Sequence, residues 1–111
     1  MPAQPMLRRK ADFEALGRHG TARSTRLLVL RSLRTNGPET RVGLSTPRSL
    51  GGAVQRNRVR RRLRELIRER RGTIGTGWDL LLIARPEAAS ASYAELRAAF
   101  GSLVERSGIG G

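Results

Sequence analysis

The sequence predicts an α+β fold, a two-layer α/β sandwich of a small sheet and helices, and three observations lead to this prediction. Residues 56–71 hold nine arginines, yet their four apolar residues recur at the spacing of one helix face. Residues 78–84 form an almost unbroken apolar run of strand length. Residues 92–104 begin with the Ser-x-x-Glu signature of a helix start and continue with helical apolar spacing. With shorter segments before them, these give the order α-β-β-β-α-β-α.

The first predicted elements are a helix at Lys10–His19 and a short strand near Thr21–Ser24. Phe13 and Leu16 lie three positions apart and therefore share one face of the helix. Gly20 follows them and is suited to end it.

Two further strands are predicted at Leu27–Leu33 and Arg41–Ser45. The first is mostly apolar, and the second alternates Val42 and Leu44 with other residues. Between them, Asn36-Gly37-Pro38 is a strong turn signal. We therefore expect these two strands to form a β-hairpin.

The arginine-rich helix is predicted to follow the Gly51-Gly52 pair and to end near Gly72. At about 100° per residue, one side of it collects the apolar residues Val59, Leu63, Leu66 and Ile67. The opposite side, called the outer face below, collects Asn57, Arg61, Arg64 and Arg68. Arg56 falls near the apolar side at the helix start, so we expect it to lean over the seam between helix and sheet.

The last predicted elements are a strand at Trp78–Ala84 and a helix that begins after Ser92. The strand lacks polar alternation after Asp79, which is typical of a strand covered on both faces. Asp79 itself is interpreted as a strand-edge residue rather than a metal ligand, and Trp78 and Phe100 are expected in the core. The glycines between residues 72 and 77 follow a helix and precede a strand, the reverse of a phosphate loop, so they are interpreted as a linker.

Length and composition predict one domain. At 111 residues the chain is too short for two well-packed cores. We expect the domain to span residues 8–106, with a flexible N-terminus at 1–7 and a flexible tail at 107–111. The absence of cysteine excludes disulfides and cysteine-ligated zinc. No apolar stretch approaches the roughly 18 to 20 residues of a membrane span, and no signal sequence is evident, so we expect a cytoplasmic protein with no membrane partner.

The formal net charge of +13 predicts a polyanion as partner. The run from Arg56 to Arg71 carries +7 of it, nine arginines less Glu65 and Glu69. Neighbouring guanidinium groups repel one another, a cost that makes sense if phosphates neutralise them in the working state. A helix for the DNA major groove is an alternative, but strands rather than a helix-turn-helix precede this helix, so RNA is favoured. A membrane-surface helix is disfavoured because its apolar residues are needed for the core.

The sequence offers little for catalysis by the protein itself. Only nine carboxylates are present, and none pairs at a spacing that resembles a two-metal nuclease site. His19, the sole histidine, is interpreted as a helix-end or solvent-facing residue. We therefore predict no catalytic residue and no metal ligand.

Two segments match a known signature. They are Arg41-Val-Gly-Leu-Ser45 and Gly51-Gly-Ala-Val-Gln-Arg-Asn-Arg-Val-Arg-Arg-Arg-Leu-Arg-Glu65. In this order they resemble the bacterial ribonuclease P protein subunit, whose signature is an Arg-Asn-Arg tract after a Gly-x-Ala-Val segment. The resemblance extends from Asp12-Phe13 to Tyr93-Ala-Glu-Leu96 and covers about residues 7 to 105.

The resemblance implies a protein that assists a catalytic RNA in removing the 5′ leader from precursor tRNA, with Mg²⁺ held mainly by that RNA and its substrate. It also implies a left-handed βαβ crossover. The implied partners are ribonuclease P RNA and the precursor-tRNA leader, with no small-molecule substrate. Implied RNA-binding residues are Arg48, Arg56, Asn57, Arg58, Arg60, Arg61, Arg62, Arg64 and Arg68. Implied leader-binding residues, in a cleft between the first helix and the sheet, are Phe13, Arg31 and Ser45.

Two positions depart from the family pattern, since Gly17 and Arg31 stand where an aromatic residue is often found. Base stacking in the cleft would then rest on Phe13 and on arginine planes, which leaves the leader preference open. The alternative function is that of a structural RNA-binding protein of the ribosomal or RNA-chaperone type.

Overall fold

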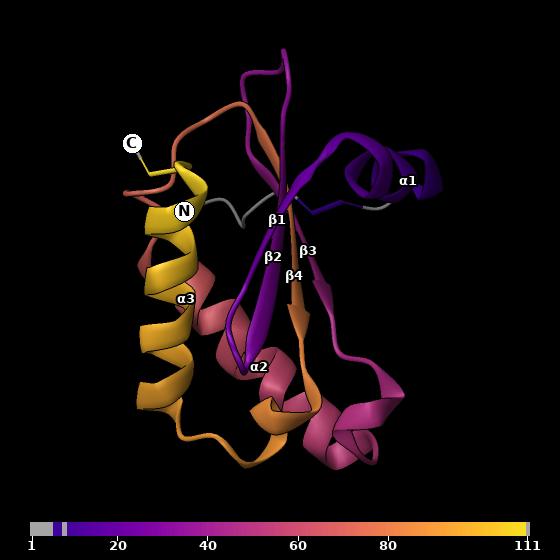
Figure 1. The fold of residues 1–111 in the computed structure, drawn as a ribbon, viewed down its shortest axis with the longest axis vertical. Coiled ribbons are helices and arrows are strands. Elements are labelled where there is room, and N and C mark those ends of the chain that lie inside the picture. The colour runs from indigo at the N-terminus through magenta and orange to yellow at the C-terminus, as the bar shows by residue number, and fades with distance from the viewer. Residues whose placement is uncertain (1–5, 8, 111) are drawn as a thin grey trace.

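The computed structural model describes residues 6, 7 and 9–110, and it confirms the predicted order of helices and strands. The elements are α1 (Lys10–His19), β1 (Thr21–Ser24), β2 (Leu28–Arg34), β3 (Arg41–Ser45), α2 (Ala53–Glu69), β4 (Trp78–Ala84) and α3 (Tyr93–Ser107). Two short 3₁₀ helices, η1 (Arg48–Leu50) and η2 (Pro86–Ser90), precede α2 and α3. Figure 1 shows α2 and α3 on one side of the sheet and α1 on the other.

The four strands are ordered β1-β2-β4-β3, and this corrects the predicted hairpin between β2 and β3. β4 lies between those two strands, antiparallel to β2 and parallel to β3. The hairpin is formed instead by β1 and β2. An apolar strand such as β4 gains most from an interior position, and its parallel pairing with β3 requires the long crossover that α2 supplies.

The main core lies between the sheet and the pair α2 and α3. Alternate residues of the strands point into it, among them Leu28, Leu30, Leu80 and Leu82, and they meet the apolar side of α2. Phe100 of α3 is buried there as predicted. Trp78 is only half-buried at the edge of this core, where the guanidinium of Arg34 lies 5.1 Å from its ring centre.

The other face of the sheet is held to α1 by a cluster of three charged side chains. Arg41 donates two hydrogen bonds to Asp79, of 2.9 and 2.7 Å, and two of 3.2 Å to Asp12 of α1. These bonds, first those to Asp79 and then those to Asp12, raise the pKa of Arg41. The interpretation of Asp79 as a strand-edge residue is therefore wrong, because it is buried on an interior strand and paired across to β3.

Both ends of the described chain pack onto the domain. Leu7 is buried and its backbone N–H donates to the carbonyl of Val42. Ile109 is also buried, and its carbonyl accepts a 2.7 Å hydrogen bond from Gly75. These packed residues differ from the free ends expected at 1–7 and 107–111, because each contributes an apolar side chain that the small core can cover. Residues 1–5, 8 and 111 lie outside the described residues.

The capping box predicted at the start of α3 is confirmed. Ser92 Oγ accepts from the backbone N–H of Glu95, and the carboxylate of Glu95 accepts from the N–H of Ser92. That backbone hydrogen bond is the main reason the pKa of Glu95 lies below its ordinary value. The pKa of Glu69 is also lowered, first by Arg97 and then by Tyr93.

These lowered pKa values predict a loss of stability in acid. A carboxylate whose pKa falls on folding stabilises the protein above its unfolded pKa, and this contribution disappears as the pH drops through the folded pKa. We therefore expect the free energy of unfolding to fall as the pH is lowered from about 5. Urea unfolding followed by Trp78 fluorescence at several pH values measures this. The double variant Glu69→Gln/Glu95→Gln should show a flatter pH dependence, and an unchanged profile would contradict the assignment.

Candidate RNA interface

The outer face of α2 is exposed as predicted. Asn57, Arg61, Arg64 and Arg68 are open to solvent, whereas Val59, Leu63, Leu66 and Ile67 are buried against the sheet and α3. The helix is thus anchored by one side and presents a dense row of cations on the other.

The structure divides six of the seven arginines of α2 into two groups, and the seventh, Arg56, is described below. In the described part of the chain, no side-chain hydrogen bond or ion pair involves Arg58, Arg61 or Arg64. By contrast, Arg60, Arg62 and Arg68 each bind a protein group. An unpaired guanidinium can give its whole fork to a phosphate, whereas a paired one must first break a bond. Arg58, Arg61 and Arg64 are therefore better placed than the paired arginines to bind a phosphate.

Arg60 links α2 to the end of β3. Its Nη1 donates to Asn57 Oδ1 at 2.9 Å, and its Nη2 donates to Thr46 Oγ1 at 2.6 Å. Thr46 is buried and directly follows Ser45. The fork of Arg60 therefore joins the outer face of α2 to the sheet.

The other paired arginines bind at the α2–α3 junction and on α2 itself. Arg62 Nη1 donates to the carbonyl of Ala91 at 3.0 Å. Arg68 Nη2 lies 2.8 Å from both carboxylate oxygens of Glu65, which raises the pKa of Arg68. The prediction that Arg68 belongs to the exposed row is confirmed, but its charge is largely matched within the protein.

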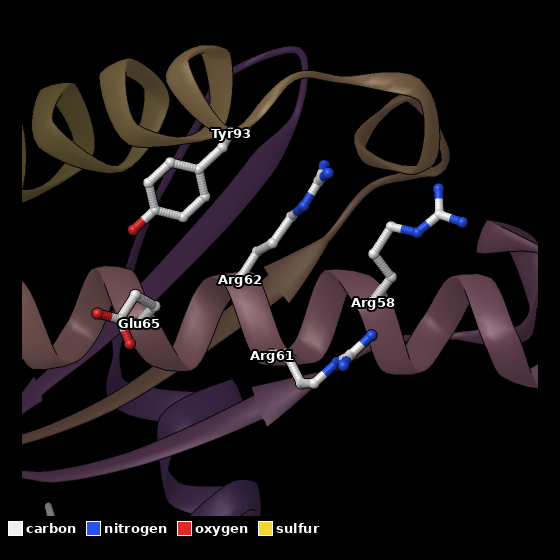
Figure 2. Close-up of a pocket in the computed structure, with 5 residues that line it drawn as sticks. All are labelled: Arg58, Arg61, Arg62, Glu65 and Tyr93. Carbon is white, nitrogen blue, oxygen red and sulfur yellow. The ribbon is translucent and has the colours of Figure 1, made fainter.

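Two open hollows flank Arg61. Figure 2 shows the first, of about 470 Å³ between α2 and the start of α3, lined by Arg58, Arg61, Arg62, Glu65 and Tyr93. The second, of about 450 Å³ on the outer face, is lined by Val54, Asn57, Arg60, Arg61 and Arg64. Val54 is 74% exposed, unusual for a large apolar residue. Both hollows offer cations beside an apolar or aromatic surface, a combination suited to nucleotides.

Two further predicted RNA-binding residues, Arg48 and Arg56, precede the exposed residues of the outer face in the chain. Arg56 is half-buried, consistent with the predicted lean toward the seam, and its buried Nε has no hydrogen-bond partner among the described residues. Arg48 is exposed in η1. Arg48 extends the basic surface from the start of α2 toward the end of β3.

The three predicted leader residues share the face of the sheet that α1 partly covers, called the α1 face below. Arg31 pairs in register with Leu81, which pairs with Gly43, and the ring of Phe13 lies over Gly43 and Leu81. Ser45 lies two residues beyond Gly43 along β3 and so faces the same way. All three side chains are half-buried. The structure therefore brings Phe13, Arg31 and Ser45 to one surface.

Gly43 leaves room for the ring of Phe13. A Cβ built on Gly43 would lie 3.0 Å from Cε1 of Phe13 and 3.3 Å from Cδ1 of Leu81. We expect Gly43→Val to destabilise the domain by about 1 to 3 kcal/mol, because the ring and α1 must move. Urea unfolding measures the loss. Gly17→Val is the matched control, since nothing lies within 4 Å of a Cβ there. Glycine has a lower helix propensity than valine, so this control should lose no stability, and equal losses for the two variants would contradict this packing role.

Several side-chain contacts that shape the site could not be predicted from the sequence. The partners of Arg41, the Thr46 hydroxyl and the Tyr93–Glu69 bond of 3.0 Å join elements far apart in the chain. Periodicity places a residue on a face of its own helix or strand but does not say which element it meets. Of these features, only the exposed Val54 has a signal in the sequence, because it is an apolar residue on the polar side of the helix.

The described residues contain no group of three or more histidine or acidic side chains that could hold a metal ion. His19 is exposed at the last position of α1. In the same part of the chain, no helix has the length and apolar character needed to cross a membrane.

Comparison with known proteins identifies the family. The family model described as Ribonuclease P matches residues 1–108. The ribonuclease P protein component of Acidothermus cellulolyticus is 40% identical over 108 residues, covering 96% of this chain and 90% of the relative. That of Roseiflexus sp. is 36% identical over 104 residues, covering 93% and 85%.

Solved structures agree with the fold. The ribonuclease P protein of Staphylococcus aureus has a TM-score of 0.86 at 23% identity and covers 94% of this chain and 95% of its own. That of Thermotoga maritima has a TM-score of 0.83 at 24% identity, with coverage of 93% and 97%. The sequence match over nearly the whole length and the shared architecture together show that the chain belongs to the ribonuclease P protein family.

Proposed function

We propose that this chain is the protein component of ribonuclease P and that it promotes the maturation of tRNA 5′ ends by binding the RNA subunit through α2. Its family membership supports the role in tRNA processing. The single observation that carries the RNA contact is the row of guanidinium groups at Arg58, Arg61 and Arg64, which have no partner among the described residues. Arg48, Arg56 and Asn57 extend this contact in the proposal.

In this proposal, the RNA subunit and Mg²⁺ catalyse the hydrolysis, and the protein side chains do not. The positions proposed for RNA binding are basic or amide side chains, which can bind and neutralise phosphate but have no general base of suitable pKa. Arginines and Mg²⁺ reduce the same repulsion between phosphates, so the protein lowers the Mg²⁺ concentration that the RNA needs. A cytoplasmic location goes with this proposal, because precursor tRNA is the substrate.

The α1 face is proposed to bind the single-stranded 5′ leader. Phe13 offers an aromatic ring edge, Arg31 a planar cation and Ser45 a hydroxyl, all on one surface. Such a set can hold a strand by stacking and phosphate contact without reading a long sequence.

The leader contact predicts a specific loss in Arg31→Ala. The assembled holoenzyme should bind precursor tRNA about tenfold more weakly, the size of one charge-assisted contact, while its affinity for mature tRNA stays unchanged. Equilibrium binding of both tRNAs measures the ratio. Arg23→Ala is the charge-matched control, because Arg23 pairs with Leu30 and so points away from the α1 face. An equal loss for both tRNAs would contradict the proposal.

A further inference from the structure

The hollow in Figure 2 has opposite chemistry at its two ends. Arg58 and Arg61 on α2 are cations that have no partner within the described chain, while Glu65, one to two turns further along, is a carboxylate. Tyr93 forms an aromatic wall from the start of α3. We propose that this hollow, called the Tyr93 pocket, takes an unpaired guanine nucleotide of the RNA subunit. The proposal rests on the proposed function and adds to it a contact that reads a base.

The cationic end suits the phosphate of that nucleotide. Neither Arg58 nor Arg61 has a side-chain partner among the described residues, so each can donate its fork. Arg62, between them and Tyr93, is held in place by its bond to the Ala91 carbonyl. The volume of about 470 Å³ accommodates a nucleotide, and its open side lets the RNA strand enter and leave.

The aromatic wall is fixed before any RNA binds. The hydroxyl of Tyr93 donates to Glu69 at 3.0 Å, and the guanidinium carbon of Arg97 lies 5.9 Å from the ring centre. Arg97 also bonds Glu69, at 2.9 and 3.1 Å, so that three side chains from two helices hold one another. A ring held in this way can stack a base with little further loss of side-chain entropy.

Glu65 gives the pocket its selectivity. A carboxylate repels phosphate but accepts hydrogen bonds from the base edge, and each of its oxygens has a lone pair beyond the bond to Arg68. Guanine presents two adjacent donors, N1–H and the N2 amino group, to match two oxygens, whereas uracil presents one N–H. In a duplex these donors are used in pairing, so the nucleotide must be unpaired.

Chemical probing of the RNA tests the pocket. Kethoxal modifies the N1 and N2 positions of unpaired guanines, and ribonuclease P RNA is probed with and without the protein. With the wild-type chain, we expect at least one unpaired guanine to become about fivefold less reactive. Glu65→Gln and Tyr93→Leu should each restore its reactivity, while Tyr93→Phe, which keeps the ring, should preserve the protection.

The variants distinguish a defect in the Tyr93 pocket from a general defect in binding or folding. Glu65→Gln removes a negative charge, so it strengthens general attraction to RNA while weakening acceptance from guanine. Cleavage of precursor tRNA at low Mg²⁺ is measured on the same samples. If the wild-type protein stimulates cleavage but protects no guanine, or if protection survives in both Glu65→Gln and Tyr93→Leu, the Tyr93 pocket is overturned and the proposed function stands. If stimulation is also absent, the proposed function fails with it.

Discussion

Replacing Arg58, Arg61 and Arg64 together by alanine is expected to flatten the salt dependence of RNA affinity by about 2 log units in Kd per tenfold change in salt. Removing one arginine–phosphate pair lowers this slope by about 0.7 units on a single strand and about 0.9 on a duplex, because fewer counterions are released on binding. All three side chains are exposed and have no partner in the described part of the chain, and alanine favours helix, so the fold should tolerate the change. Titration of ribonuclease P RNA at several salt concentrations measures the slope.

The choice of these three residues follows from the structure rather than from helical phase. Phase alone selects Arg61, Arg64 and Arg68, but Arg68 is matched by Glu65 at 2.8 Å, whereas Arg58 has no partner among the described residues. The charge-matched control is Arg26→Ala/Arg85→Ala/Arg106→Ala, which removes an equal number of positive charges, all outside α2. If this control flattened the slope as much as the α2 variant, RNA affinity would depend on the net charge of the protein and not on the position of the arginines. The assignment of the interface to α2 would then be wrong.

Arg41→Ala is expected to lower the free energy of unfolding by about 3 kcal/mol or more. It leaves the Asp79 carboxylate, only 6% exposed, without its partner and facing a second carboxylate on Asp12. Removing one member of a buried ion pair costs about 3 to 5 kcal/mol, because the remaining charge stays desolvated. It also removes the ion pair between the sheet and Asp12 of α1. Urea unfolding followed by Trp78 fluorescence measures the loss.

Two companion variants make the Arg41 result specific. Arg41→Lys keeps the charge, but an ammonium group cannot form the four hydrogen bonds of the guanidinium. Its free energy of unfolding should therefore lie between those of the wild type and Arg41→Ala. Arg34→Ala removes an exposed arginine from β2, and the free energy of unfolding should fall by less than about 1 kcal/mol. A loss below about 1 kcal/mol for Arg41→Ala would show that the cluster of Arg41, Asp12 and Asp79 does not hold α1 in place.

The local elements could be predicted from the sequence because their signals are local. The apolar side of α2, the capping box at Ser92 and the buried Phe100 depend on spacing within one segment, and the structure confirms them. The exposed outer face follows from the same phase. The family resemblance supplied what periodicity could not, namely the polyanion that we propose as partner of the arginines.

Pairing between segments could not be predicted. The turn at Asn36-Gly37-Pro38 suggested a hairpin, yet β4 enters between β2 and β3 because burying its apolar residues outweighs the local turn preference. Which arginines of α2 are free also depends on distant groups, such as Thr46 for Arg60 and Ala91 for Arg62.

The most direct test of the central claim is cleavage of precursor tRNA by ribonuclease P RNA with and without this protein, over a series of Mg²⁺ concentrations. The proposal predicts that the protein strongly stimulates cleavage at low Mg²⁺ and that its effect shrinks as Mg²⁺ rises, because arginines and Mg²⁺ screen the same phosphates. RNA sequencing of nucleic acid that co-purifies with the chain identifies the partner independently. Cleavage that the protein leaves unchanged at low and high Mg²⁺ alike would contradict the account.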